Sequence, residues 1–285
     1  MSKQLILNAD DFGRHHFINE AVIQGVEKGM LRSATAMVTG EAFPEAVAIA
    51  KAYLRLSVGI HFTLVNGKPV LPAKDIPSLV NPATGEFYPN HGVFVKRFLA
   101  GKVHLAEVRK ECEAQLERFL SYGITPTHGD SHQHMHVLPG IIDIVLDLLR
   151  SHGILALRIP AIPVALASTR LSNLGEQVGR SGLHVLAERA RKKARALGFA
   201  VPDHFGGIVA GEAVDTAALR TLLLHLGPGV TEIMMHPGTD NSVLIPATEW
   251  DHDFQAELAA ILDPKLQKLA KDEQVQVVNF SQLKA

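Results

Sequence analysis

The sequence predicts an α/β fold, specifically a TIM-like (β/α) barrel with about seven strands and some irregularity. Apolar runs alternate with amphipathic stretches along the whole chain, and strands that alternate with helices form parallel sheets. The chain has 285 residues, of which 47% are hydrophobic, enough for a large core. No internal repeat divides the sequence, so we expect residues 1–285 to form a single barrel domain.

Apolar runs and helical spacing locate the elements of the first part of the chain. Strands are expected at 4–9, 34–38 and 57–61, and helices at 18–28 and 44–54. Gly29 stops the first of these helices. Each of the strands at 4–9 and 57–61 is followed by polar side chains, as expected of buried strands that carry functional groups at their ends.

Prolines and glycines interrupt the pattern from Val65 to Val103. A loop of this length inside a compact domain is usually functional. Because it directly follows a strand that ends in a histidine, we expect residues 65–103 to lie over the mouth of the barrel as a lid or a substrate wall.

The second part of the chain resumes the alternation of strands and helices. Strands are expected at 125–129, 154–159, 230–235 and 275–278, and helices at 105–120, 140–151, 183–197, 216–226 and 248–262. A crossing that contains prolines and serines spans 160–173. The helix at 183–197 is strongly basic, and we interpret its charges as a solvated outer face.

Composition excludes several classes of partner. The net charge of −1 gives no electrostatic footprint for nucleic acid or an anionic membrane. No apolar run is long enough to span a bilayer, and the N-terminus lacks the pattern of a signal peptide. Cys112 is the single cysteine, which rules out an intramolecular disulfide and makes a thiolate metal site implausible. We expect a cytoplasmic protein, and a homodimer stays open.

The stretch from Thr127 to His136 contains four histidines and an aspartate. This density of imidazoles indicates metal binding more readily than packing. Three other interpretations remain at this point: a solvated polar turn, core histidines bonded to the backbone, or a loose metal-binding tract without catalysis. A catalytic site also needs ligands from elsewhere in the chain.

Polar residues occur at the ends of four predicted strands, and parallel strands bring such ends together at one face of a barrel. One carboxylate and two imidazoles would hold a divalent ion and leave positions for water and substrate. Asp11 or Asp10 and His61 can serve, with one or two histidines of the 127–136 stretch. The remaining aspartate could then take a proton from water, although adjacent aspartates also cap helices.

Four motifs together resemble those of the YdjC-like carbohydrate deacetylases, which include chitooligosaccharide deacetylases and deacetylases of hopanoid biosynthesis. They are Asn8-Ala9-Asp10-Asp11-Phe12-Gly13, Gly59-Ile60-His61-Phe62-Thr63-Leu64, the stretch from Thr127 to His136, and His236-Pro237-Gly238. Their order and spacing are kept from residue 4 to about residue 240.

The resemblance implies a (β/α) barrel with fewer or less regular units, and metal-dependent hydrolysis of an acetamido group on a sugar. It assigns one divalent ion, Mg²⁺ or Zn²⁺, to Asp11, His61 and His132. Asp10 corresponds to the base and His236 to the acid. The surrounding residues are expected to orient ligands, brace the cleft or contact substrate: Phe62, His128, Asp130, His134 and His136.

The resemblance leaves the substrate open between a chitooligosaccharide and a glycosylated hopanoid lipid. Residues 202–207 resemble the hopanoid branch, and apolar residues at 160–182 could then form a lipid-facing wall, although they suit an ordinary core better. Two other functions are considered. A metal-dependent phosphoesterase would need a cationic clamp, for which only Arg14 is near the motifs. A non-catalytic, metal-stabilised sugar-binding protein would not need the spare Asp10 and His236.

Overall fold

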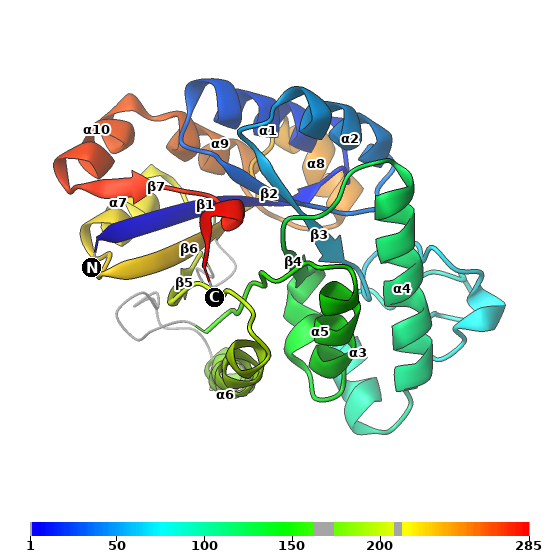
Figure 1. The fold of residues 1–285 in the computed structure, drawn as a ribbon. Helices are drawn as coiled ribbons and strands as arrows, with labels where there is room; N and C mark the ends of the chain where they lie inside the picture. The colour runs from blue at the N-terminus through cyan, green and yellow to red at the C-terminus, as the bar shows by residue number, and fades with distance from the viewer. Residues whose placement is uncertain (1, 162–173, 208–212, 285) are drawn as a thin grey trace.

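The computed structural model describes residues 2–161, 174–207 and 213–284. Its centre is one parallel sheet of seven strands in the order β4, β3, β2, β1, β6, β5, with β7 paired to the start of β1. Figure 1 shows the sheet wrapped by helices on its outer side. The strands are β1 (Lys3–Phe12), β2 (Ser33–Ala36), β3 (Ser57–Phe62), β4 (Gly129–Ser131), β5 (His204–Gly206), β6 (Gly229–Met235) and β7 (Val275–Val277).

Helices connect the strands and cover the sheet. They are α1 (His16–Lys28), α2 (Phe43–Ala52), α3 (His91–Leu99), α4 (Leu105–Ser121), α5 (Ile141–Ser151), α6 (Leu174–Ala196), α7 (Thr216–Leu224), α8 (Asn241–Thr248), α9 (Phe254–Leu262) and α10 (Pro264–Asp272). Short 3₁₀ turns are η1 (Ala73–Asp75), η2 (His132–Val137) and η4 (Phe280–Gln282). The predicted α/β barrel with about seven strands is therefore confirmed.

The sheet is open between β4 and β5, and the apolar segment 154–159 bridges this opening. It forms isolated parallel bridges from Leu157 to Gly129 and from Ala156 to Ala200. Backbone hydrogen bonds accompany both, including Leu157 N–H to Ala200 at 3.1 Å and Arg158 N–H to Gly129 at 3.0 Å. The prediction of a regular strand here was wrong, since only single bridges form. The segment nevertheless places Arg158 inside the barrel.

Several predicted boundaries need correction. The segment 65–103 contains helix α3 and contributes buried side chains to the main core, namely Ile76, Leu79, Val80, Phe87 and Phe94. The helix predicted at 248–262 begins only at Phe254, where Asp253 caps α9, because Thr248 is the last residue of α8 and Glu249 ends that helix in a left-handed conformation. Strand β5 and helix α10 were not predicted, and α6 begins earlier than residue 183.

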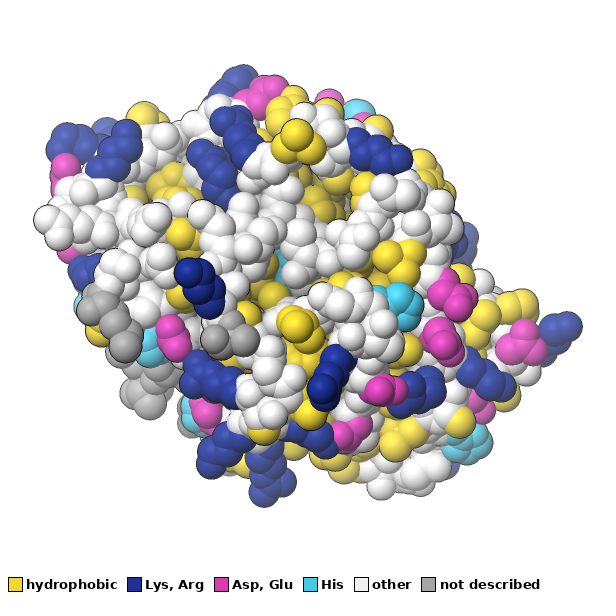
Figure 2. Space-filling view, viewed as in Figure 1, with side chains coloured by type: hydrophobic (Ala, Val, Ile, Leu, Met, Phe, Trp, Pro, Cys, Tyr) yellow, Lys and Arg dark blue, Asp and Glu magenta, His cyan; other side chains and the backbone are white. Residues whose placement is uncertain are grey.

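The basic helix α6 faces solvent, as predicted. Arg189, Lys192, Lys193 and Arg195 are exposed, and Arg195 pairs with Asp203 at 3.0 Å. Figure 2 shows Lys and Arg side chains gathered over this helix in the lower part of the view. Most of the crossing expected at 160–173 lies outside the described residues. Among the described residues, no helix combines the length and apolarity needed to cross a membrane.

Candidate functional site

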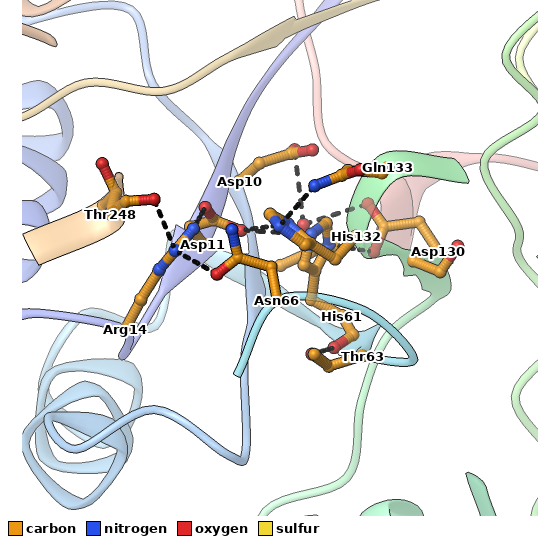
Figure 3. A network of polar contacts seen from close by, with 12 residues as sticks. Asp10, Asp11, Arg14, His61, Thr63, Asn66, Asp130, His132, Gln133 and Thr248 are labelled. Atoms are coloured by element: carbon orange, nitrogen blue, oxygen red, sulfur yellow. Dashed lines mark hydrogen bonds and ion pairs between the residues drawn. The ribbon is translucent and has the colours of Figure 1, made fainter. Parts of the chain in front are cut away.

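The end of β1 presents two consecutive carboxylates at the barrel mouth. In a regular strand, adjacent side chains point to opposite faces. Here the register between β1 and β2 shifts between Ala9 and Phe12, and Asp11 has a φ of +58°. Aspartate tolerates this left-handed conformation better than most residues. The irregularity lets Asp10 and Asp11 both join one polar network at the end of the strand (Figure 3).

Strands β3 and β4 bring further polar groups to the same edge. His61 pairs in register with Asp130, and His132 begins the 3₁₀ turn that follows β4. In that turn Gln133 and His134 have φ values of +51° and +60°. The chain changes direction sharply in this turn after β4, and His132 lies beside Asp11 (Figure 3).

Asp11, His61 and His132 form a compact buried triad. Oδ1 of Asp11 lies 3.0 Å from Nδ1 of His132 and 3.3 Å from Nε2 of His61. Oδ1 of Asp11 and Nε2 of His61 are buried, and within residues 2–161, 174–207 and 213–284 neither has a hydrogen-bond partner. Leaving such atoms unpaired costs about 1–3 kcal/mol each. One ligand atom from each residue lies within 4.8 Å of the others, so a divalent ion with bonds of roughly 2 Å would fit among them.

Asp130 fixes the orientation of the His61 ring. Nδ1–H of His61 donates to Oδ1 of Asp130 at 2.7 Å, which directs Nε2 toward Asp11. Burial alone would lower the pKa of His61, but the Asp130 carboxylate, the neighbouring Asp11 carboxylate and the hydrogen bond to Asp130 raise it to about 10. The two carboxylates beside the ring favour positive charge at this position. A bound cation would take the place of that proton.

Arg14 holds the second oxygen of Asp11. Its Nη1 donates to Oδ2 of Asp11 at 2.9 Å, and its Nη2 donates to Oδ1 of Asn66 at 3.0 Å. Burial alone would raise the pKa of Asp11, but His132 and Arg14 hold it well below its usual range. Because Arg14 binds Oδ2 of Asp11, Oδ1 is the oxygen that could bind a metal ion. Asn66 belongs to the segment 65–103, which reaches the site at this point.

Arg158 organises the carboxylates beneath the triad. Its Nη1 and Nη2 donate to the two oxygens of Asp10, each at 2.6 Å. Nη1 also lies 2.7 Å from Asp130, and Nε donates to Glu232 at 2.7 Å. The guanidinium is fully buried, and these carboxylates supply the compensation that a buried cation requires. Asp10 is not the cap of α1, because His15 occupies that position.

His236 follows β6, where Met235 pairs with Ala9, so it lies next to the Asp10 end of β1. Its backbone N–H donates to the Glu257 carboxylate, and its ring meets Trp250 edge-on at 4.8 Å. Burial lowers the pKa of His236, and the carboxylates of Asp10, Glu257 and Asp11 offset part of this effect. The pKa of His236 therefore lies below that of an exposed histidine.

The remaining histidines of the 127–136 stretch brace the barrel. His128 stacks on Phe280 with ring centroids 3.7 Å apart. His134 is buried and meets Phe205 edge-on at 5.7 Å. His136 bonds to Ser131 Oγ and to the Arg158 carbonyl at 2.7 and 3.0 Å. The interpretation as core histidines bonded to backbone therefore applies to His136. Phe62, expected to support the ligands or contact substrate, is fully buried in the main core.

The bracing role of His136 gives a prediction. His136→Ala should lower the free energy of unfolding by about 2–4 kcal/mol, because it removes the ring's bond to Ser131, leaves the Arg158 carbonyl unpaired and opens a cavity. The number of metal ions bound per folded chain should stay the same. Urea denaturation and metal analysis would measure the two quantities. Loss of a bound ion in stably folded His136→Ala protein would show that this imidazole is a ligand.

Sequence reasoning missed Arg158 and Glu232. Both are charged residues inside apolar runs, at 154–159 and 230–235, and a charge there is a signal of a buried polar network. It also missed Asn66, and the residues around His236, namely Trp250, His252 and Glu257. These side chains come from segments whose positions depend on the complete fold.

Comparison with known proteins agrees with the motifs. The family description "YdjC-like protein" matches residues 4–272. A carbohydrate deacetylase from Brevibacillus brevis is 32% identical over 285 residues, covering 98% of this chain and 99% of that protein. A chitooligosaccharide deacetylase from Serratia marcescens is 30% identical, and the match covers 93% of each protein.

A solved structure supports the same relationship. The crystal structure of a candidate cellobiose-phosphate cleavage protein from Enterococcus faecalis V583 is similar to this chain with a TM-score of 0.75 and 26% identity. The match covers 98% of both chains. With a family match over nearly its whole length, this chain belongs to the YdjC-like family.

Proposed function

We propose that this chain is a metal-dependent hydrolase that removes the acetyl group from an N-acetylated sugar. The observation that carries the proposal is the convergence of Asp11, His61 and His132 next to Asp10, with buried ligand atoms that lack a hydrogen-bond partner among the described residues. The names of the relatives from Brevibacillus brevis and Serratia marcescens support this class of reaction.

We assign one divalent ion to the triad. Two imidazoles and one carboxylate suit Zn²⁺, and the oxygen-rich surroundings also admit Mg²⁺. Such an ion supplies Lewis-acid chemistry, because it makes water more acidic and polarises the acetyl carbonyl. Asp11 and the imidazoles of His61 and His132 hold it, while Arg14 and Asp130 keep two of these ligands in place.

Asp10 is proposed to take the proton of the attacking water. Its Oδ1 accepts hydrogen bonds from Asn8 and Arg158, whereas Oδ2 accepts one, from Arg158. A carboxylate oxygen can accept two bonds, so Oδ2 keeps a lone pair for a proton. Asp10 also lies close to the triad, since one of its oxygens is within 4.8 Å of ligand atoms of His61 and Asp130.

His236 is proposed to protonate the leaving amine. Since its pKa is lowered, the imidazolium is a stronger acid than that of an exposed histidine. The Glu257 carboxylate anchors the backbone of His236, and Trp250 packs against its ring. These contacts fix the imidazole at the mouth, near Asp10, where an amide bond would lie between base and acid.

The alternative functions fit the site less well. A phosphoesterase needs free cationic groups for its substrate, but Arg14 and Arg158 are both bonded to carboxylates. A purely structural metal would be enclosed by four protein ligands, whereas the triad offers three. Both observations favour hydrolysis of a neutral substrate.

Within this class, we propose the N-acetylglucosamine unit of a chitooligosaccharide as the substrate. The side chains of the motif at 202–207, which resembles the hopanoid branch, mainly form contacts that stabilise the fold. Asp203 pairs with Arg195 and accepts the Val230 N–H at 3.0 Å, and Phe205 is buried in β5. A lipid-linked N-acetylglucosamine therefore serves as the competing substrate in the assay below. The apolar residues at 160–182 that could contact its lipid lie mostly outside the described residues.

An acetate-release assay tests this proposal. Metal-loaded protein should release acetate and free amine in equal amounts from N,N′-diacetylchitobiose, and metal-stripped protein should release neither. A lipid-linked N-acetylglucosamine and a phosphate monoester would be assayed in parallel. Preference for the lipid substrate would change the substrate assignment. Hydrolysis of the phosphate ester alone would overturn the reaction class.

The segment 65–103 is proposed to contact substrate at the mouth. Asn66 bonds to Arg14, and the Nδ1 atom of the His91 ring lies 2.9 Å from Oε1 of Gln133. Because the segment also supplies core residues, deleting it would unfold the protein, so point changes are the better test. In Asn66→Ala and in His91→Ala, the ratio of the kcat/KM values for two different acetylated sugars should change several-fold. The unfolding temperature should stay near that of the wild type. Identical substrate preferences in both variants would contradict a role in specificity.

A further inference from the structure

A second group of metal-ligating side chains lies beside the proposed acid. His236, His252 and Glu257 each offer one ligand atom, and these atoms lie within 4.8 Å of one another. They come from the end of β6, from the loop between α8 and α9, and from the first turn of α9. His252 and Glu257 are buried, with exposed fractions of 4% and 1%, and His236 is half-buried.

His252 is held in place by aromatic contacts. Its ring stacks on Trp250 with centroids 3.9 Å apart and meets Phe254 edge-on at 4.8 Å. Both Nδ1 and Nε2 are buried, and neither forms a hydrogen bond with any residue that the structure describes. A neutral imidazole has one donor and one acceptor nitrogen, and leaving either unpaired costs about 1–3 kcal/mol. His136, by contrast, has protein partners for both ring nitrogens.

Glu257 is oriented toward these imidazoles by the backbone. Its Oε1 accepts the Val214 N–H at 2.8 Å, and its Oε2 accepts the His236 N–H. Oε1 also lies 3.3 Å from Nε2 of His252. Each carboxylate oxygen keeps a second lone pair, so the group can contact a cation without losing the bonds that fix it.

We propose that His236, His252 and Glu257 form a second divalent-cation site, and that its occupation inhibits the enzyme. Two imidazoles and a carboxylate suit Zn²⁺, whereas Mg²⁺ prefers oxygen ligands in near-octahedral geometry, so Zn²⁺ is the expected ion. Inhibition follows because a His236 nitrogen bonded to a cation cannot deliver a proton. This last step rests on the proposed function, while the binding itself does not.

A calorimetric titration with Zn²⁺ tests the site. Metal-free wild-type protein should bind two equivalents, and His252→Gln should bind one. His252→Phe, which keeps an aromatic ring against Trp250, should also bind one and guards against a folding defect in the first variant. The matched control is His225→Gln at the end of α7, an exposed histidine outside the cluster, which should bind two. One equivalent in the wild type, or two in both His252 variants, would overturn the proposal.

The inhibitory step is tested by the rate of acetate release at increasing Zn²⁺. The wild-type rate should rise until one equivalent of Zn²⁺ has been added, and it should fall at least tenfold in excess Zn²⁺. The His252→Gln variant should need a Zn²⁺ concentration at least tenfold higher for the same fall in rate. Equal inhibition of both proteins would overturn the inhibitory role. If no sugar is deacetylated but the second equivalent still depends on His252, the proposed function fails and the second site stands.

Discussion

Replacing Asp10 with asparagine should reduce kcat by about 10²- to 10⁴-fold, the range for loss of a general base. Asparagine has nearly the same shape, and its one side-chain oxygen can still accept hydrogen bonds from Asn8 and from one nitrogen of Arg158. Its NH2 group loses the second Arg158 bond and cannot take a proton from water. Arg158 keeps Asp130 and Glu232 as partners, so the folded structure should persist. Metal affinity should change little, because Asp10 is outside the Asp11–His61–His132 triad.

Initial rates of acetate release, together with metal titration of the same preparation, would measure these effects. Asp147→Asn is the matched control, since Asp147 is exposed and forms only a surface pair with Arg109. It should keep wild-type kcat. Near-normal turnover by folded Asp10→Asn protein would mean that Asp10 serves only the buried ion pair with Arg158.

Replacing Arg158 with methionine should lower the free energy of unfolding by more than about 3 kcal/mol, because removing one partner of a buried ion pair leaves uncompensated charge. Three carboxylates, those of Asp10, Asp130 and Glu232, would lose their common cation. Burial already raises the pKa of Glu232 to about 8 despite Arg158, and the nearby Asp130 carboxylate adds to this. Without the guanidinium, these carboxyl groups would take up protons or open the barrel.

Urea denaturation of Arg158→Met and Arg158→Lys measures this effect. Lysine keeps the charge but cannot bind both oxygens of Asp10 and Glu232 together, so its stability should fall between those of the wild type and Arg158→Met. Arg109→Met, which removes an exposed pair between α4 and α5, should cost about 0–1 kcal/mol. An Arg158→Met protein as stable as Arg109→Met would contradict the organising role of Arg158.

Local sequence patterns predicted the parts of the fold that depend on local chemistry. The run before Asp10 and Asp11 is a buried strand, and the amphipathic spacing after His104 is helix α4. Patterns failed where tertiary contacts decide the structure. Strand β5 has three residues and exists because it pairs with β6, and segment 154–159 is held by single bridges. Helix α3 is hidden among the prolines and glycines of the segment 65–103, although Asn90 caps it.

The candidate site also contains residues that local motifs could predict and residues whose positions depend on tertiary contacts. Asp11, His61 and His132 could be named from the motifs, and the structure brings them together. The left-handed conformation of Asp11 could not be predicted, because the bulge in β1 depends on its pairing with β2. Arg158 comes from a segment with no motif, and its role depends on three carboxylates from three different strands.

We expect a divalent ion to bind between Asp11, His61 and His132. Anomalous diffraction from crystals grown with one equivalent of Zn²⁺ would locate this ion. An anomalous peak should lie at bonding distance, roughly 2.0–2.2 Å, from a carboxylate oxygen of Asp11 and from one nitrogen each of His61 and His132. A peak at any other position, with this triad still joined only by its own polar contacts, would show that the triad is not the metal site.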